Sequence, residues 1–442
     1  MSMRALDVRI NDQLVGQLRE DDNIWELEYA DVWRTQASGF DLSPALSRAT
    51  ALHRDGSSNR PVQWYFDNLL PEETMRAMVA KDAKIDAEDS FGLLAYYGRE
   101  SAGSIVLDAP GSNSALSERG LRPLSRKELS RRIADMPRVS LSSGAPKKMS
   151  LAGAQHKLLV VLKGDELFEP KAGTASTHIL KPEHGGEDYP CSVINEYFTM
   201  RLAKDVGLDV PTVRRMYAPQ PVYLVARFDR IMDKKNGEVK RLHAIDTCQL
   251  LNKSRTFKYH AADVTALSSA IKLCRQKAGA RIKLFKWLAF NILVGNGDNH
   301  LKNISFIVES GDIRVAPAYD LLSTSVYETM ALADDKAQWP QTSLALMVGS
   351  AKTFAEVTRE DVLTAAAQMG LSRRTAQREL DRLITAMPIA ADRLINEISA
   401  RMEDDIATSP DQAVAQTFVA GEQRLLRAIR HIIINDMVKS LA

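Results

Sequence analysis

Apolar and polar residues alternate along the start of the chain. Two runs place apolar side chains at every second position: Leu6, Val8 and Ile10, then Trp25, Leu27 and Tyr29. The polar pair Asn11–Asp12 follows the first run and is typical of a turn. Period-two spacing on either side of a polar turn predicts a small antiparallel sheet here.

The pattern then changes to the spacing of helices. From about Ser43 to Asp82 the apolar positions follow a helical pattern, and Pro71–Glu72–Glu73 has the composition of a helix start. Ser104–Leu107 is strand-like again. Pro110–Ser117 is rich in turn-forming residues, which predicts a linker.

From about residue 148 short apolar runs alternate with one helical stretch. The expected strands are 157–162, 176–181 and 222–228, and the expected helix is 192–206, ending at Gly207. The remainder is mainly helical. Arg281–Val294 has the pattern of a buried amphipathic helix, and residues 304–315 have that of a β-hairpin. The whole pattern predicts an α+β protein.

Length and charge narrow the class of protein. A chain of 442 residues is long for one hydrophobic core, so we expect two or three domains or lobes. Its 58 basic and 56 acidic residues give a formal net charge of +2, which argues against a protein that mainly coats nucleic acid. The densest basic segment, Pro123–Arg138, is better interpreted as a solvated helix face.

Cysteine usage and hydropathy bear on the compartment. Cys191, Cys248 and Cys274 are widely separated, with neither the spacing of a disulfide framework nor that of a zinc site. The first residues lack the apolar stretch of a secretory signal, and no apolar window approaches the roughly 20 residues that span a bilayer. We therefore expect a soluble, cytoplasmic protein with no membrane partner.

Two features of the middle of the chain suit a nucleotide phosphate. Ser150–Lys157 (SLAGAQHK) is a small-residue loop whose backbone N–H groups can point at phosphate oxygens, although a β-turn is the commoner outcome for such a loop. Lys181 closes an expected strand, and Glu196 lies on the helix that follows. A kinase carries a lysine and its acidic partner in such positions, although surface charge is the commoner role of each taken singly.

The segment GDNHLKN, residues 297–303, has the spacing of a kinase catalytic loop. Asp298 and Asn303 stand five positions apart, where phosphoryl transfer needs a carboxylate for the attacking hydroxyl and an amide oxygen for a metal ion. Asp320 follows the expected hairpin and supplies a second carboxylate suited to Mg²⁺. The order of loop, lysine, catalytic loop and metal aspartate predicts a kinase.

These segments together resemble the HipA family, the toxin kinases of bacterial toxin–antitoxin pairs. FDNLLPEE (66–73) and FGLLAYYGRESAGSIVL (91–107) are similar to the family's N-terminal subdomain. SLAGAQHK, THILKPE, NEYF, ARFDR, GDNHLKN and YDLLS follow in the family's order. The resemblance implies a bilobal α+β fold, related to phosphoinositide kinases, with a β-rich N-terminal subdomain and a mainly helical C-lobe.

The same resemblance implies a domain layout and a set of site residues. The segments would be an N-terminal subdomain (1–112), a linker and helix (113–147), a kinase N-lobe (148–230) and a helical C-lobe (231–442). The phosphate-binding loop would comprise Ala152, Gly153, Ala154, Gln155, His156 and Lys157. The remaining ATP contacts would be Lys181, the hinge Ala226, Arg227 and Phe228, and the side chains of His300, Asn303, Tyr319 and Asp320.

Within this set, Asp298 would be the catalytic base, and Asn303 and Asp320 would bind Mg²⁺. Ser150 falls at the position of the family's autophosphorylated loop serine. One departure is Ala226, where an acidic residue is expected. Since adenine is held there largely through the backbone, the change affects only the fine nucleotide preference.

The implied activity is that of an ATP- and Mg²⁺-dependent protein serine/threonine kinase. Its partners would be a small helix-turn-helix antitoxin similar to HipB, operator DNA through that antitoxin, and a protein substrate, with aminoacyl-tRNA synthetases among the candidates. Two alternatives stay open: a small-molecule or lipid kinase, and a DNA-binding regulator. The second rests on Thr364–Leu380, which has the pattern of a helix-turn-helix but is better interpreted as a helical hairpin.

Overall fold

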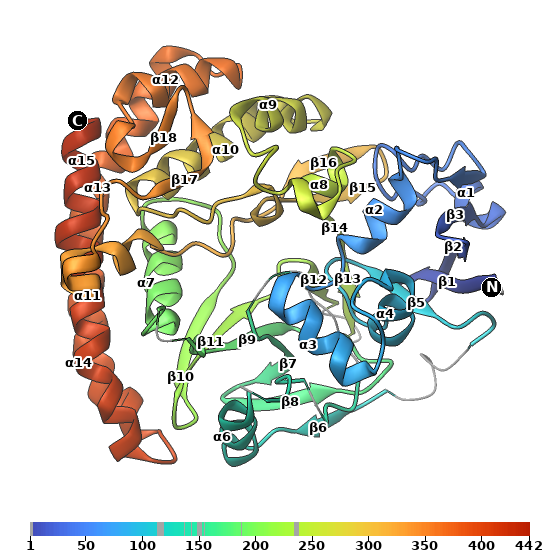
Figure 1. Cartoon of the computed structure of the whole chain (residues 1–442), viewed down its shortest axis with the longest axis horizontal. Helices are drawn as coiled ribbons and strands as arrows, with labels where there is room; N and C mark the ends of the chain where they lie inside the picture. The colour runs from blue at the N-terminus through green and yellow to red at the C-terminus, as the bar shows by residue number, and fades with distance from the viewer. Residues whose placement is uncertain are drawn as a thin grey trace. The chain divides into compact units, whose positions relative to one another are not determined.

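The computed structural model in Figure 1 describes residues 3–112, 119–136, 138–142, 144–147, 153, 155–186, 188–233 and 238–442. The chain forms two compact units, each assembled from three segments. Unit 1 consists of Met1–Leu180, Ala226–Phe257 and Ser305–Ala316, and unit 2 of Lys181–Val225, Lys258–Ile304 and Pro317–Ala442. The division into four consecutive domains stays a prediction.

The N-terminal part of unit 1 is an antiparallel sheet, as the alternating pattern predicted. Its strands, in the order β4-β3-β2-β1-β5, are β1 (Arg4–Ile10), β2 (Gln13–Asp21), β3 (Ile24–Tyr29), β4 (Leu52–Arg54) and β5 (Ile105–Asp108). Asn11 (φ 46°) and Asp12 (φ 67°) join β1 to β2 in the left-handed conformation. Two such residues match the twist of a tight hairpin, and Asn and Asp tolerate them.

Helices of unit 1 only partly follow the predicted pattern. They are α1 (Asp31–Thr35), α2 (Pro61–Asp67), α3 (Glu73–Ala83), α4 (Ser90–Tyr97), α6 (Arg126–Asp135) and α8 (Thr247–Leu250), with the 3₁₀ turn η1 (Arg255–Phe257). The helix start at Glu73 is confirmed. The helical expectation for residues 43–60 is wrong, because Leu52–Arg54 pairs as edge strand β4 with β3.

The remaining strands of unit 1 confirm three of the sequence predictions. Four strands lie in the order β6-β8-β7-β9: β6 (Leu121–Pro123), β7 (Leu158–Lys163), β8 (Glu166–Pro170) and β9 (His178–Pro182), of which unit 1 includes β9 only as far as Leu180. A separate hairpin consists of β12 (Arg230–Met232) and β13 (Val239–Arg241). β14 (His243–Asp246) pairs with the predicted hairpin of β15 (Ser305–Glu309) and β16 (Asp312–Val315).

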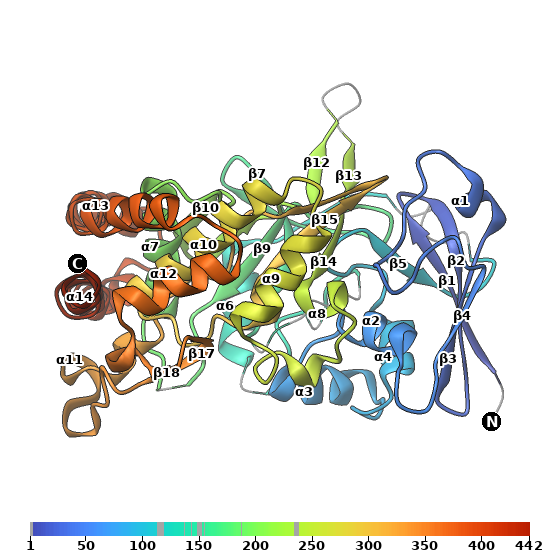
Figure 2. The ribbon, with the colours of Figure 1, turned by 90° about the horizontal axis from the view of Figure 1, so that it is seen from above.

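Unit 2 is mainly helical. Its helices are α7 (Ser192–Asp205), α9 (Val264–Leu273), α10 (Lys277–Leu293), α11 (Met330–Ala333), α12 (Arg359–Gln368), α13 (Arg373–Ala407), α14 (Gln412–Ala428) and α15 (Asn435–Leu441). Short 3₁₀ helices are η2 (Leu301–Asn303), η3 (Ser325–Glu328), η4 (Asp334–Lys336) and η5 (Phe354–Glu356), and the π-helix η6 (Ile429–Ile434) joins α14 to α15. Figure 2 shows α13 and α14 side by side, almost end-on.

Two hairpins interrupt the helices of unit 2. β10 (Val213–Tyr217) pairs with β11 (Pro221–Ala226), and β17 (Ser343–Val348) pairs with β18 (Ala351–Thr353). The second hairpin was missed, since helices were expected throughout that region. α12 and α13 form the helical hairpin favoured for residues 364–380, with Gly370 at φ 78° and Ser372 capping α13.

Candidate active site

Lys181 lies at the centre of a buried ion cluster in unit 2. Its Nζ lies 2.7 and 2.9 Å from the two carboxylate oxygens of Glu196 and 2.5 Å from Oδ1 of Asp320. Burial disfavours the charged ammonium, but the attraction of Asp320 and Glu196 outweighs it and raises the pKa of Lys181 above its usual value. The lysine is therefore a fixed positive charge.

Helix α7 positions both partners of this cluster. Glu196 reaches Lys181, while the preceding residue, Asn195, binds the backbone of Ser323 in both directions: its Nδ2 donates to the carbonyl oxygen and its Oδ1 accepts from the N–H, each at 2.8 Å. Asp320 itself has a left-handed backbone, with φ 56°. A non-glycine residue in this conformation is uncommon, and functional sites are where it concentrates.

A short loop after α10 carries Asp298. Gly295 turns the chain with φ 63°, and a Cβ there would lie 2.8 Å from Cγ2 of Ile433. The loop is held by side chains: Oδ1 of Asn296 accepts from the Asp298 N–H at 3.0 Å, and Nδ2 of Asn303 donates to the Asp298 carbonyl at 2.7 Å. Asp298 and Asn303 are thus brought together as the spacing predicted.

The carboxyl of Asp298 has two neighbours on its Oδ1 side. The hydroxyl of Tyr259 donates to Oδ1 at 2.7 Å, and Nε2 of His300 lies 3.9 Å from the same oxygen. Nearly half of the Asp298 side chain is exposed (47%), yet the surrounding protein displaces enough water to raise its pKa, while His300 and Tyr259 act to lower it. Sequence reasoning missed Tyr259, which no motif marked.

The side chains of Tyr319 and of the predicted hinge residues Arg227 and Phe228 make contacts within the protein. The Tyr319 hydroxyl donates to the backbone carbonyl of Lys302 at 2.8 Å, which ties the Asp320 segment to the catalytic loop. Arg227 is buried: its guanidinium lies 2.6 Å from Asp229 and 3.3 Å from Glu100. Phe228 packs on the apolar cluster of Ala244, Ile307 and Ala316. Ala226 ends β11. Any nucleotide contact from Arg227 or Phe228 would therefore use the backbone.

Glu100 is the centre of this second buried cluster, in unit 1. It is fully buried and pairs with four basic side chains: Lys147, Arg227, Arg230 and Arg241. Burial alone would raise its pKa, but the four cations lower it well below its usual value. A buried carboxylate so compensated organises the segments around it.

The predicted phosphate-binding loop belongs to unit 1 and is only partly described. Ser150, Ala152 and Ala154 lie outside the described residues. Gly153 has φ 111°, and a Cβ there would lie 2.3 Å from Nζ of Lys157. Gly153, Gln155 and Lys157 line a small pocket with residues of α3. His156 is half-buried.

In unit 2 the geometry is that of a phosphotransfer enzyme. A lysine held by a helix glutamate, a D-x-x-x-x-N loop and a later aspartate are the parts with which kinases transfer phosphoryl groups. Among the described residues no helix is long and apolar enough to cross a membrane.

Comparison with known proteins gives the family. The HipA N-terminal domain matches residues 6–108 and the HipA-like C-terminal domain matches residues 149–391. The chain is 31% identical over 411 residues to Y4mE of Sinorhizobium fredii, covering 90% of this chain and 94% of that one. It is 32% identical over 343 residues to the serine/threonine-protein kinase toxin HipA of Shewanella oneidensis, covering 73% and 76%.

A solved structure is similar over almost the whole length. It is the complex of Shewanella oneidensis HipA with HipB and operator DNA; the match has a TM-score of 0.75 and 26% identity, and covers 98% of this chain and 99% of that one. The chain belongs to the HipA family and is a serine/threonine-protein kinase. The predicted α+β fold, with its N-terminal β-sheet subdomain and helical C-terminal region, is confirmed.

Proposed function

We propose that this kinase transfers the γ-phosphoryl group of ATP to a serine or threonine hydroxyl, with Asp298 as its catalytic base. Asp298 accepts the hydroxyl proton as the oxygen bonds to the γ-phosphorus and the bond to the leaving oxygen of ADP breaks. Lys181 offsets phosphate charge. The observation that carries the proposal is the Lys181 cluster with Glu196 and Asp320, in the same unit as the Asp298–Asn303 loop.

The residues present fit a magnesium ion. Because Nδ2 of Asn303 donates to the Asp298 carbonyl, the amide oxygen is the atom left for a metal, and Asp320 adds carboxylate oxygens. Mg²⁺ usually takes few protein ligands and completes its shell with phosphates and water. Bound Mg²⁺ would neutralise charge on the phosphates.

Ser150 is the proposed site of self-inhibition. Lys147, three residues earlier, is fully buried and bonded to Glu100 at 2.5 Å and to the Thr174 carbonyl at 3.1 Å, so the chain before the serine is anchored. A phosphate on Ser150 would add roughly −1.5 to −2 charges beside N–H groups that the ATP phosphates need. We expect it to lower nucleotide affinity.

The proposed partners follow from the relative. The Shewanella complex contains HipB and operator DNA, and we propose that this chain likewise pairs with a small helix-turn-helix antitoxin. The formal net charge of this chain is only +2, which supports the proposal that the antitoxin would make most of the DNA contacts. The protein substrate is proposed to be intracellular, with aminoacyl-tRNA synthetases as candidates.

The decisive experiment removes the catalytic base. Asp298→Ala should lower phosphate transfer from ATP and Mg²⁺ by at least about 10²-fold, as is typical for acid–base groups. The matched control is Asp404→Ala, at an exposed position of α13. Mass spectrometry of the same incubation should find phosphate on Ser150. Near-normal transfer by Asp298→Ala would refute the mechanism, and phosphorylation of inositol lipids or antibiotics instead of proteins would favour the alternative kinase class.

A further inference from the structure

Tyr259 contacts the proposed catalytic base although it lies 39 residues away in sequence. It lies two residues after the end of η1, outside any helix or strand. Its hydroxyl donates to Oδ1 of Asp298 at 2.7 Å, while the residue as a whole is 43% exposed. An exposed tyrosine that points its hydroxyl at a partly exposed carboxylate is accessible from the solvent from which an acceptor would arrive.

Two contacts join the tyrosine segment to the catalytic loop, and a third comes from the neighbouring Lys258. The ring meets that of His300 edge-on, with centroids 4.9 Å apart and planes at 83°. The Lys258 ammonium lies 5.0 Å from the Tyr259 ring centroid. The carbonyl of Lys258 accepts a hydrogen bond from the N–H of Leu301 at 3.2 Å. The catalytic loop therefore holds the Tyr259 side chain in place.

A hydrogen-bond donor on one carboxylate oxygen restricts the direction in which the other oxygen points. The terminal torsion of an aspartate is broad, so an unbraced carboxyl samples many orientations. A hydrogen bond to a charged group is stronger than one between neutral groups, so a donor on one carboxylate oxygen restricts that torsion. With Oδ1 held by Tyr259, Oδ2 is left in a defined direction for an incoming hydroxyl, as catalysis requires.

We propose that Tyr259 is a positioning residue, which holds Oδ1 of Asp298 so that Oδ2 receives the acceptor hydroxyl. This inference rests on the proposed role of Asp298 as base. The competing interpretation is that Tyr259 occupies the acceptor's place and must be displaced. The ring contact with His300 and the hydrogen bond from the Leu301 N–H to the Lys258 carbonyl favour positioning, because both join the Tyr259 segment to the catalytic loop.

The test is Tyr259→Phe in the full-length chain, which removes only the hydroxyl. Transfer from ATP and Mg²⁺ to one defined serine peptide, chosen from a peptide library, is measured at varied peptide and ATP concentrations. We expect kcat to fall about 10-fold, corresponding to about 1.4 kcal/mol, with the KM for ATP changed less than about two-fold. The melting temperature should stay within about 2 °C of the wild type.

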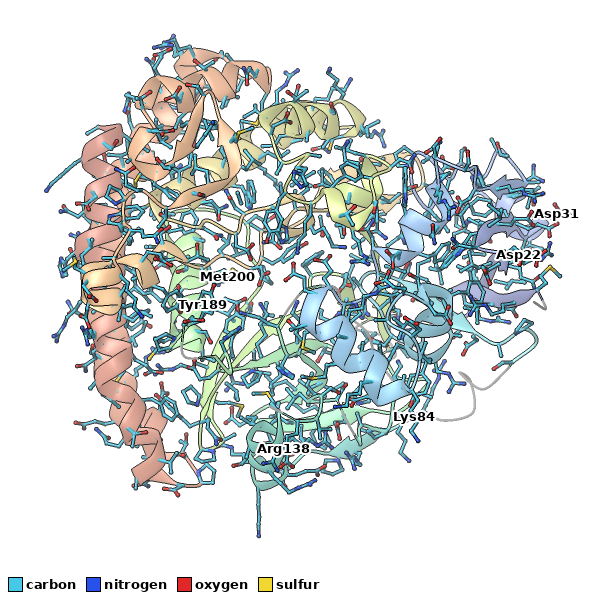
Figure 3. All side chains as sticks on the ribbon, in the orientation of Figure 1. Asp22, Asp31, Lys84, Arg138, Tyr189 and Met200 are labelled. Atoms are coloured by element: carbon cyan, nitrogen blue, oxygen red, sulfur yellow. The ribbon has the colours of Figure 1, made fainter. Side chains whose placement is uncertain are left out.

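Tyr189→Phe is the matched control. Tyr189, labelled in Figure 3, is 44% exposed and contacts the rings of His184 and Tyr327 rather than Asp298. Tyr189→Phe removes the same hydroxyl group from a tyrosine of the same unit, and it should leave kcat and both KM values unchanged. Equal losses in the two variants would mean that the effect is structural, which would overturn the proposal.

Other outcomes also decide the matter. An unchanged kcat in Tyr259→Phe overturns positioning, and a raised kcat with a lower peptide KM shows that Tyr259 blocks the acceptor. A rise in ATP KM alone would assign Tyr259 to the nucleotide instead. Asp298→Asn distinguishes failure of the proposed base from failure of the proposed role of Tyr259. If Asp298→Asn stays active, Asp298 is not the base. If Asp298→Asn is inactive and Tyr259→Phe is normal, only the role of Tyr259 is refuted.

Discussion

Two carboxyls of unit 2, those of Glu183 and Glu196, have different neighbours. Glu196 faces Lys181, whereas Glu183 accepts hydrogen bonds from the hydroxyl of Ser192 and the N–H of Val193. Glu422 on α14 raises the energy of the Glu183 charge further. Burial is the largest cause, and together these effects raise the pKa of Glu183 from 4.5 to about 7. A residue two positions from Lys181 is thus neutral over a range where Glu is usually charged.

The pH dependence of stability follows with a definite sign. Between about pH 4.5 and about pH 7 the folded chain holds the Glu183 proton and the unfolded chain loses it, so the contribution of Glu183 to stability falls as pH rises. Glu183→Gln keeps the shape without the charge and should reduce this decline. Thermal melting at about pH 5 and about pH 7.5 measures it, with exposed Glu166→Gln as control. Parallel pH profiles in wild type and Glu183→Gln would contradict the assignment.

At the scale of elements, the site depends on where helices end. α10 ends at Leu293, and the turn at Gly295 directs the chain into the Asp298 loop. α7 presents Asn195 and Glu196 in adjacent positions, so one helix fixes both the Ser323 backbone and Lys181. The geometry of the site in this unit therefore depends on α7 and α10, which contact residues far away in sequence.

Gly295→Ala tests the turn. A left-handed backbone costs a non-glycine residue about 1–2 kcal/mol, and the added Cβ would also press on Ile433. Gly164→Ala is the control, because Gly164 has a similar φ of 60° but nothing within 4 Å of the added atom. We expect chemical denaturation to show a loss for Gly295→Ala larger by about 1–3 kcal/mol, with reduced kinase activity. Equal losses would show that η6 yields to the new methyl group.

At the scale of the whole chain, the match to HipA extends over both family domains, and the partners are the remaining question. We predict that a small helix-turn-helix protein, coexpressed from a neighbouring gene, copurifies with this chain and that the complex shifts operator DNA. The chain alone should not shift it at moderate salt, since its net charge is only +2. A shift by the chain alone, abolished by changing exposed arginines of α13, would instead support direct DNA binding through α12 and α13.

Local sequence patterns are enough to predict the short-range structure and the kinase residues of unit 2. Alternation and the Asn11–Asp12 turn specified the first hairpin, because local sterics decide which residues tolerate left-handed backbone. The spacing of Asp298 and Asn303 fixed the catalytic loop, since five residues of chain cannot separate them far. The order of motifs along the chain was sufficient for the family.

Contacts between residues far apart in sequence depend on the folded chain, and local patterns do not predict them. The apolar pattern of residues 43–60 predicted a helix, but part of this segment pairs as β4 with β3 instead. Local periodicity does not indicate such a pairing. The guanidinium of Arg227 lies in the buried cluster of Glu100, 127 residues away, and no spacing in the sequence indicates that ion pair. Tyr259 stood in no motif. Its contact with Asp298 exists because folding brings Lys258 beside Leu301, and a separation of 39 residues leaves no trace in hydrophobic spacing.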